Sequence, residues 1–464
     1  MKILKEQNSK EHLNIEESLI TKMTNEKYFY SNQQIYERKW KIFIVNCCLF
    51  LILTMAVDAP QQMQYILENK HKYTTLKYLL FFIIVNFISC FTRRIINNFR
   101  KAYSNKTALM IIYSCLIIGQ FFFYYGLSKD SYMITIIGRF FLALSKDPLS
   151  IIIISQISKV FLHHYGNIPL SIINSMSVIG NILNCFILPY YLENYPIQYS
   201  SFVYLIMLLF GILFIIIVYL IEFNLEINSL NESFMRAELS KKRSSFLNRN
   251  SSEISEGSLN NNYKFFDFSS FIEEFRYFTK EFYLITISGS LSFLQLFNYT
   301  FILNDYYTVN YNFSLQTSGN IIACFFILCL IQMPLFLYLS KLLKNKLNFL
   351  ILGNVCAIFL SLFTLIEIDF YYLNILLHSI EFSIFVGIIT ECFPYIVDQE
   401  HYSYAFEFNR IILYFSVGSG ALICGVVVTL LPWLKFIFPY YFFIIVNLVS
   451  IKLLLKVKEN CENL

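Results

Sequence analysis

The sequence has few charged residues and few residues that interrupt helices. Only 14% of its 464 residues are Asp, Glu, Lys or Arg, and glycine and proline number 14 and 9. An average soluble domain is about 25% charged, so this chain has too little polar surface to cover one globule in water. The low charge excludes a single soluble domain and indicates burial in lipid.

Motifs for catalysis and for metal binding are also missing. The sequence contains no GxSxG, no HExxH and no P-loop Gly-Lys-Ser/Thr pattern. Its 11 cysteines include no CxxC pair, and most lie inside apolar runs, where a thiol behaves as a small apolar side chain. The net charge of +5 is spread over loops, which excludes a dedicated nucleic-acid surface. We therefore expect no enzyme activity, no cofactor and no metal.

Long apolar runs fill most of the chain, which is 56% hydrophobic. Because about 20 apolar residues cross a bilayer as a helix, the sequence predicts an all-α membrane protein with twelve transmembrane helices. The spans are expected at 40–58, 74–92, 107–127, 132–157, 165–189, 199–221, 282–304, 316–340, 346–366, 370–392, 403–429 and 433–456.

Polar segments divide these spans into two groups of six. Residues 1–39 are polar and contain no short apolar stretch with a cleavage site, so the first span is expected to act as an uncleaved membrane signal. The segment 223–281 is rich in Ser, Asn and charge and is expected to be a largely disordered cytoplasmic linker. It separates an N-terminal half at 40–222 from a C-terminal half at 282–457, and 458–464 form a cytoplasmic tail.

Lys and Arg concentrate in the loops on one side of the predicted spans. Arg93 and Arg94 follow the second span, Lys241 and Lys242 lie in the linker, and Lys344 joins spans eight and nine. Cytoplasmic loops carry an excess of basic residues, so both termini are expected to be cytoplasmic. This plan is typical of major facilitator transporters, whose two six-helix halves enclose one midplane site that opens to each side in turn.

The first intramembrane charge, Asp58, closes the first span in the stretch MAVDAPQQMQ. Pro60 ends or bends the helix there, and the glutamines that follow, Gln62 among them, offer amide groups to water. We expect Asp58 and Gln62 to line the outer mouth of a solute pathway. The alternative is an ordinary helix end at the membrane interface.

Three charges share one side of span four, namely Arg139, Lys146 and Asp147. If that side faces the pathway, Asp147 binds an ammonium or a proton and Arg139 or Lys146 binds a carboxylate. Alternatively, Lys146 and Asp147 neutralise one another near Pro148, and Arg139 extends to the membrane interface.

The second half offers candidates for a proton or gating role. His378 and Glu381 lie three residues apart in span ten and predict either a proton-coupled pair or a hydrogen-bonded structural pair. Glu391, nearer the cytoplasmic end, is expected at a gate or a linker contact. Glu407 and Arg410 in span eleven are expected mainly to pair with each other.

Glycines cluster in span eleven, at Gly418, Gly420 and Gly425. Small residues let helix backbones approach closely and slide, as two rocking halves require. Plain packing is the alternative explanation.

Several segments, taken in order, resemble one branch of the major facilitator superfamily. They include VDAPQQMQ after span one, GRFFLALSKDPLS in span four, SMSVIGNILN in span five and FPYIVDQEHYSYAF between spans ten and eleven. In these segments the chain resembles the lysosomal dipeptide uniporter branch known as major facilitator superfamily domain-containing protein 1.

The resemblance implies a lysosomal or vacuolar carrier that exports dipeptides together with a glycosylated membrane partner. It implies that Asp147, which stands where the branch has a glutamate, contacts the peptide amino group. Val178 stands where the branch has an arginine suited to the peptide carboxylate, so Arg139 becomes the expected charge partner. The cytoplasmic loops CFTRRIINNFRKAY and YLSKLLKNKLN depart from the superfamily pattern, the first lacking its glycine and acid, and offer no usual gate latch.

We therefore expect a transporter of small polar or zwitterionic solutes, with dipeptides as the leading class. Alternating access would occur by facilitated diffusion or by proton-linked flux. Solute contacts are expected from Asp58, Gln62, Arg139, Asp147 and Glu381. The alternatives are a carrier of another organic solute (amino acid, organic anion or sugar), a non-transporting receptor or scaffold, and a location in another endomembrane or in the plasma membrane.

Overall fold

The computed structural model describes residues 40–102, 105–165, 168–217, 220, 278–343, 346–366, 371–397 and 401–460. Within these ranges the regular structure is helical throughout. The predicted polar tail at 1–39 and most of the predicted disordered linker at 223–281 lie outside the described residues and stay predictions. The last two residues of that linker, 280–281, already belong to the helix α9 (Lys280–Asn310).

The N-terminal half begins with a helix over residues 40–58 that tightens into a 3-10 turn. Its elements, in chain order, are this first helix, η1 (Ala59–Gln62), α2 (Gln64–Asn69), α3 (Thr75–Ala102), α4 (Asn105–Ser128), α5 (Tyr132–Tyr165), α6 (Ile168–Asn194) and a helix at 197–217.

The C-terminal half has the same plan. Its elements are α9 (Lys280–Asn310), α10 (Leu315–Leu343), α11 (Lys346–Leu365), α12 (Tyr371–Ile388), η3 (Ile389–Tyr395), α13 (Tyr402–Leu430), η5 (Pro432–Leu434) and α14 (Phe438–Asn460).

Eleven helices in the described ranges are long and apolar enough to cross a membrane. The one predicted span that is not among these eleven is the seventh, which corresponds to α9; this helix has 31 residues and so exceeds the length that a bilayer requires. It is less apolar because it carries buried polar side chains such as Ser292, Gln295 and Asn298. These groups hydrogen-bond to neighbouring helices or to their own backbone instead of facing lipid, so the all-helical membrane fold is confirmed.

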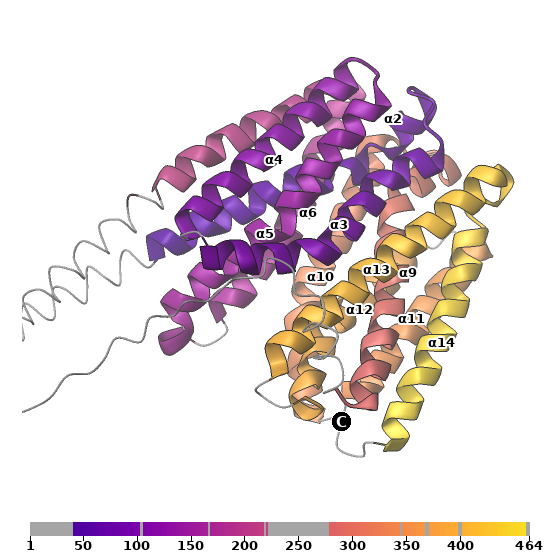
Figure 1. Ribbon diagram of the computed structural model, residues 1–464. Coiled ribbons are helices and arrows are strands. Elements are labelled where there is room, and N and C mark those ends of the chain that lie inside the picture. The colour runs from indigo at the N-terminus through magenta and orange to yellow at the C-terminus, as the bar shows by residue number, and fades with distance from the viewer. Residues whose placement is uncertain are drawn as a thin grey trace, which may run out of the picture.

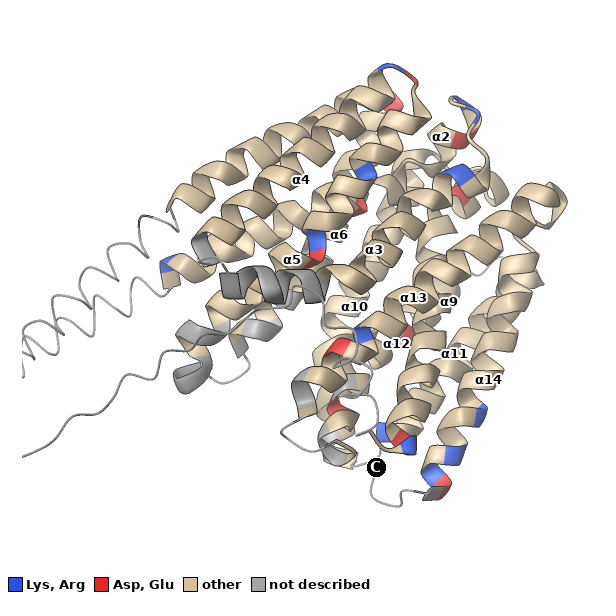
Figure 2. Ribbon diagram, in the orientation of Figure 1, with Lys and Arg blue, Asp and Glu red and all other residues tan. Residues whose placement is uncertain are grey.

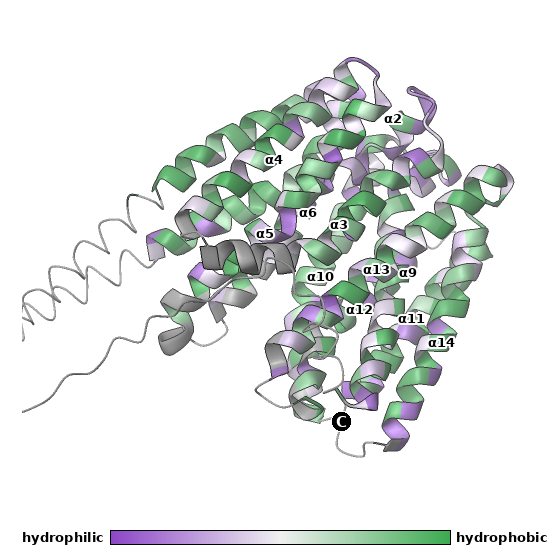
Figure 3. Ribbon diagram, viewed as in Figure 1, coloured by the Kyte–Doolittle hydropathy of each residue, from purple (hydrophilic) through white to green (hydrophobic). Residues whose placement is uncertain are grey.

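The distribution of apolar and charged residues also fits a membrane fold. Apolar residues cover most of the helical surface (Figure 3), and charged residues gather mainly near helix ends (Figure 2). Large apolar side chains such as Met133, Phe210, Ile331 and Ile445 are exposed, as lipid contact requires.

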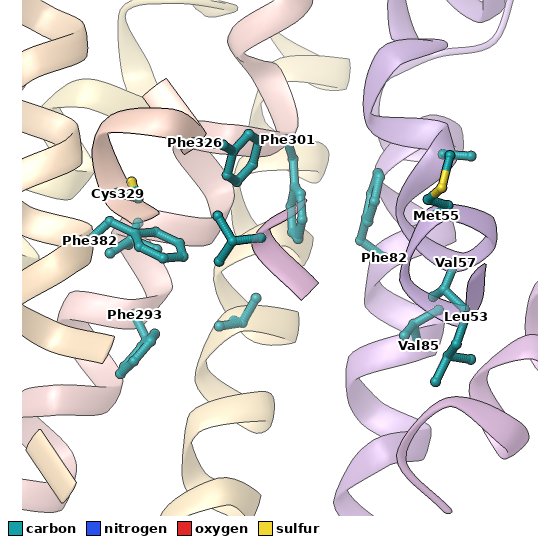
Figure 4. Close-up of a cluster of buried hydrophobic side chains, with 14 of the residues drawn as sticks. Leu53, Met55, Val57, Phe82, Val85, Phe293, Phe301, Phe326, Cys329 and Phe382 are labelled. Carbon is teal, nitrogen blue, oxygen red and sulfur yellow. The ribbon is translucent and has the colours of Figure 1, made fainter. Parts of the chain in front are cut away.

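The two halves contact each other chiefly through α3 with α13 and α6 with α10. Leu76 N donates to Thr429 Oγ1 (3.2 Å), and the Tyr78 hydroxyl donates to the Phe301 carbonyl (2.8 Å). The rings of Phe82 and Phe301 stack across the junction at 4.1 Å (Figure 4). These contacts belong to the helix ends whose loops are predicted to be non-cytoplasmic, here called the outer end.

Toward the opposite, inner end, the helices of the two halves diverge (Figure 1). The structure therefore represents the state that is closed on its outer side.

Glycines shape the α3–α13 contact as the sequence predicts. A Cβ on Gly425 would lie 2.9 Å from a methyl carbon of Leu76, and one on Gly418 would lie 3.3 Å from the ring of Phe87. Both neighbours belong to α3 in the other half. These glycines therefore let the helices of the two halves approach closely.

Candidate solute-binding site

The break at the end of the first span positions Asp58. Pro60 lies in the first turn of η1, and Asp58 is the residue on which that turn begins. Because proline lacks an N–H, the helix cannot continue in α form through this point. The predicted break after span one is confirmed.

Arg139 of α5 stabilises this break from a fully buried position, being 1% exposed. Its guanidinium donates to the Val57 carbonyl (2.8 Å) and twice to the Phe81 carbonyl (3.2 Å each). The rings of Phe82 and Phe123 lie about 6 Å from it. Arg139 reaches neither the membrane interface, as one prediction had it, nor any exposed surface of the described structure.

Lys146 of α5 pairs with Asp58, at 3.1 Å between Nζ and Oδ1. Their side chains are 29% and 15% exposed, respectively. The prediction that Lys146 and Asp147 neutralise one another is therefore wrong: Lys146 contacts the first span instead of its neighbour in sequence. The pair joins a partly exposed cation of α5 to a partly exposed anion at the end of the first helix.

Asp147 lies at the junction between the halves and is 6% exposed. Its Oδ1 accepts a hydrogen bond from the Tyr414 hydroxyl of α13, at 3.0 Å. Its Oδ2 is buried and has no hydrogen-bond partner within the described ranges. A buried carboxylate oxygen without a donor is unfavourable, so this atom has free capacity for an ammonium or N–H group.

Gln62 does not line an open mouth, because it is only 2% exposed. Its amide donates to Cys185 Sγ (3.2 Å), and its Oε1 accepts from Asn304 Nδ2 (2.7 Å). Asn304 belongs to α9 of the other half. In this state Gln62 therefore helps to close the outer end, and the prediction of a water-facing glutamine is wrong for it.

His378 and Glu381 form a pair inside the C-terminal half, with 3.3 Å between Nδ1 and Oε2. Glu381 is fully buried and also accepts a hydrogen bond from Gln295 of α9. The ring of Phe325 stacks on His378 at 4.5 Å. The structure thus favours the structural pair over a solute contact, since the partners of Glu381 all belong to its own half.

The remaining candidates lie toward the inner end. Glu391 is half-buried in η3, and Glu407 and Arg410 are half-buried on α13. No ion pair joins Glu407 to Arg410 in the part of the chain that the structure describes. The expectation that these two residues pair with each other is therefore wrong for this state.

Sequence analysis missed Tyr414, and it missed an ion-pair cluster at the outer end formed by Glu68, Asp305 and Lys435. A tyrosine in an apolar helix carries no signal of its role. Asp305 carried one, as an acid at the outer end of the seventh predicted span, with Lys435 at the outer end of the twelfth.

Together, the fold and the site define a membrane protein with two helical halves, an ion pair within the first half and a buried carboxylate at the junction between them. A sequence profile described as Major Facilitator Superfamily matches residues 103–401, and the chain belongs to this superfamily. Members of this superfamily are membrane transporters of small solutes and not enzymes, so the chain is a small-solute membrane transporter.

Solved structures with the same fold include the nucleoside transporter NupG, with 12% identity, coverage of 91% of this chain and 98% of that chain, and a TM-score of 0.65. A bacterial homolog of the human lysosomal transporter Spinster, inward-facing and unoccupied, has 10% identity, coverage of 90% and 95%, and a TM-score of 0.61. A POT family transporter in complex with 5-aminolevulinic acid has 12% identity, coverage of 89% and 95%, and a TM-score of 0.60.

At these identities the likeness shows the fold alone. No curated protein sequence matches the chain.

Proposed function

We propose that this transporter carries zwitterionic solutes, with dipeptides as the leading class, by alternating access. The observation that carries the proposal is the free, buried Oδ2 of Asp147, which lies one residue from the partly exposed cation Lys146. A solute with an ammonium and a carboxylate matches this pair of charges.

The ammonium of the solute binds Asp147. The Tyr414 hydroxyl already donates to Oδ1 and so fixes the carboxylate while leaving Oδ2 available. Because Tyr414 and Asp147 belong to different halves, a solute bound here contacts the seam along which the halves move.

The carboxylate of the solute binds Lys146, which takes the role that the sequence suggested for Arg139. Lys146 is 29% exposed, whereas all three hydrogen bonds of Arg139 go to backbone carbonyls. The solute carboxylate replaces Asp58 on the lysine. This exchange is isoelectric, because one carboxylate replaces another.

Two further observations support a peptide-like solute. The chain resembles the dipeptide uniporter branch in ordered segments, and POT family neighbours were solved with 5-aminolevulinic acid and with a thioalcohol conjugated peptide. The same resemblance supports a lysosomal or vacuolar location and a glycosylated accessory partner. Flux would follow the solute gradient or a proton gradient, without ATP.

Uptake of a labelled dipeptide into proteoliposomes tests the proposal. Asp147→Asn should raise KM at least about tenfold, because the charged partner of the ammonium is lost. Glu459→Gln, which changes an exposed acid near the C-terminus, is the matched control and should leave KM unchanged. If Asp147→Ala leaves transport of every accepted solute intact, the site assignment is wrong.

Competition by a panel of solutes tests the substrate class. Inhibition by dipeptides without inhibition by free amino acids, sugars or organic anions supports the proposal, and the reverse pattern assigns another carrier. A thermal shift with dipeptides but no uptake would identify a receptor on the same fold.

A further inference from the structure

Buried polar atoms without a hydrogen-bond partner gather at one place inside the C-terminal half. Four helices contribute them, and these helices pack on one another within that half (Figure 1). The side chains whose polar atoms lack a partner within the described residues are those of Tyr299 and Tyr307 on α9, Ser361 on α11, Asn374 and His378 on α12, and Tyr440 on α14. Each of the six is at most 1% exposed. We call them the buried polar cluster.

Ring contacts join three helices of the cluster. The ring centroid of Tyr299 lies 4.5 Å from that of His378 and 5.8 Å from that of Tyr440. The unpaired atoms of these residues are the two tyrosine hydroxyls and Nε2 of His378. Groups on α9, α12 and α14 therefore lack partners in the same small region.

The remaining members lie beside this group. The Tyr299 hydroxyl lies near the hydroxyls of Tyr307 and of Thr364 on α11, but neither tyrosine hydroxyl makes a hydrogen bond within the described ranges. Ser361 precedes Thr364 by about one turn of α11, and Asn374 precedes His378 by one turn of α12, so each shares a face with its neighbour. Neither the oxygen nor the nitrogen of the Asn374 amide has a partner in the described structure.

Buried tyrosines of the N-terminal half behave differently. The Tyr113 hydroxyl donates to the Leu208 carbonyl (2.9 Å), and the Tyr204 hydroxyl donates to Asn184 Oδ1 (2.8 Å). Both tyrosines are 2% exposed. The shortage of partners is therefore a property of the buried polar cluster and not of buried tyrosines throughout this chain. Because an unpaired buried polar group is unfavourable, several at one place indicate that they share a bound partner.

The charges near the cluster limit what that partner can be. Only His378 among the six can carry a charge, and its Nδ1 lies 3.3 Å from the Glu381 carboxylate, which repels an anion. A hard cation requires several oxygen ligands, above all carboxylates. The carboxylate of Glu381 already accepts from Gln295 and contacts His378, and no group of three or more His, Cys, Asp or Glu side chains occurs in the described ranges. The partner is therefore small, polar and neutral.

We propose that the buried polar cluster binds ordered water molecules in the core of the C-terminal half. Hydroxyl, amide and imidazole groups need donors as well as acceptors, and water supplies both. Buried waters typically make about three hydrogen bonds to groups that have no other partner. Such waters link α9, α11, α12 and α14 where direct hydrogen bonds do not. They also explain how the polar side of α9 lies inside its half.

X-ray radiolysis of the solute-free protein in detergent tests this water site. Radiolysis converts water into hydroxyl radicals in place, so a buried side chain is oxidised only where water lies beside it. Tyr299 and Tyr440 should be oxidised at least about fivefold faster than Tyr113 and Tyr204, which are similarly buried but already paired. Tandem mass spectrometry assigns the oxidation to each tyrosine. Equal rates for the two pairs would overturn the proposal.

The stability of Tyr440→Phe provides a second measurement. If water binds the hydroxyl, its removal should lower the midpoint of thermal unfolding by about 1–2 °C, because the water loses a partner. In a dry environment the same change would raise the midpoint, because an unpaired buried group is removed. A midpoint that does not fall would therefore contradict the water site. Tyr441→Phe, at the next residue of α14, is the control, since Tyr441 is 58% exposed.

Neither measurement contains a solute, so the water site is tested independently of the proposed substrate. Absent dipeptide uptake together with fast oxidation of Tyr299 and Tyr440 would refute the substrate and leave the water site standing. Dipeptide uptake with slow oxidation of both tyrosines would do the reverse.

Discussion

Arg139 shows, at the scale of one residue, how a charge inside a membrane span can be purely structural. Its three hydrogen bonds fix the first span at Val57 and α3 at Phe81. This connection places the break at Pro60 and holds Asp58 within reach of Lys146. A buried guanidinium that binds carbonyls thus positions the residues of the proposed site.

Arg139→Met is therefore expected to lower the free energy of unfolding by about 2–5 kcal/mol, since two buried carbonyls lose their donors. The free energy of unfolding of Arg139→Lys should lie between those of the unaltered chain and of Arg139→Met, because an ammonium cannot reproduce the guanidinium fork. Thermal unfolding in detergent without solute measures both. Loss of uptake at unchanged stability would instead return Arg139 to the solute site.

Tyr414→Phe tests the positioning of Asp147. Removing the hydroxyl leaves Oδ1 without its donor and lets the carboxylate turn, so the dipeptide Kd should rise about tenfold, as expected for a hydrogen bond to a charged group. Tyr404→Phe on the same helix, where Tyr404 is 43% exposed, is the matched control. Equal Kd values for the two variants would remove Tyr414 from the site.

At the scale of elements, the packing of α6 against α10 closes the outer end. A Cβ on Gly319 of α10 would lie 2.4 Å from the Cys185 carbonyl and 2.5 Å from Pro189 of α6. Because one of these atoms is backbone, the clash cannot be relieved by a side-chain rotation. The two helices can stay this close only with glycine at this position.

Gly319→Ala should therefore push α6 and α10 apart. The rate at which the Cys185 thiol reacts with a membrane-impermeant maleimide should then rise several-fold. The state that is closed at the outer end should be destabilised by about 1–3 kcal/mol. Gly387→Ala is the control, because the nearest atom to its Cβ lies 3.7 Å away, an ordinary contact. Similar rates in both variants would mean that the α6–α10 contact does not hold the outer end closed.

At the scale of the whole molecule, the proposed alternating access requires the two halves to separate at the outer end in each transport cycle. Leu76 and Thr429 lie across this junction, joined by a 3.2 Å hydrogen bond from backbone to hydroxyl. A covalent link between them would hold the molecule in the described state.

In the double variant Leu76→Cys/Thr429→Cys, oxidation should abolish uptake and reduction should restore it, because a disulfide forms only between closely spaced residues. The single variant Thr429→Cys should show no effect of oxidation. Uptake that survives complete cross-linking, verified by mass spectrometry of the joined peptides, would contradict alternating access through this junction.

The fold was largely predictable because each span must satisfy its own backbone in lipid, which makes apolar length a sufficient signal. The exception is instructive. Helix α9 is the least evident span, since its polar residues Ser292, Gln295 and Asn298 are buried against other helices. Its polarity reflects a central position in its half, which only packing reveals.

The residue types of the proposed site were predictable from the sequence, but the partner of each residue was not. Asp58, Lys146 and Asp147 were identified as rare intramembrane charges, and one alternative had Lys146 and Asp147 neutralise each other near Pro148. The structure instead joins Lys146 to Asp58 and Asp147 to Tyr414, across distances of 88 and 267 residues in the sequence.

The sequence by itself determined a helical membrane protein with two halves, the break after span one and the scarcity of charge, because these depend on local hydropathy and on proline. Only the tertiary structure decided which charges are structural, which are exposed, and that Glu68 and Lys435 meet across the junction. Those outcomes depend on contacts between helices distant in sequence, and the energy of a buried charge is set by the partner that such a contact provides.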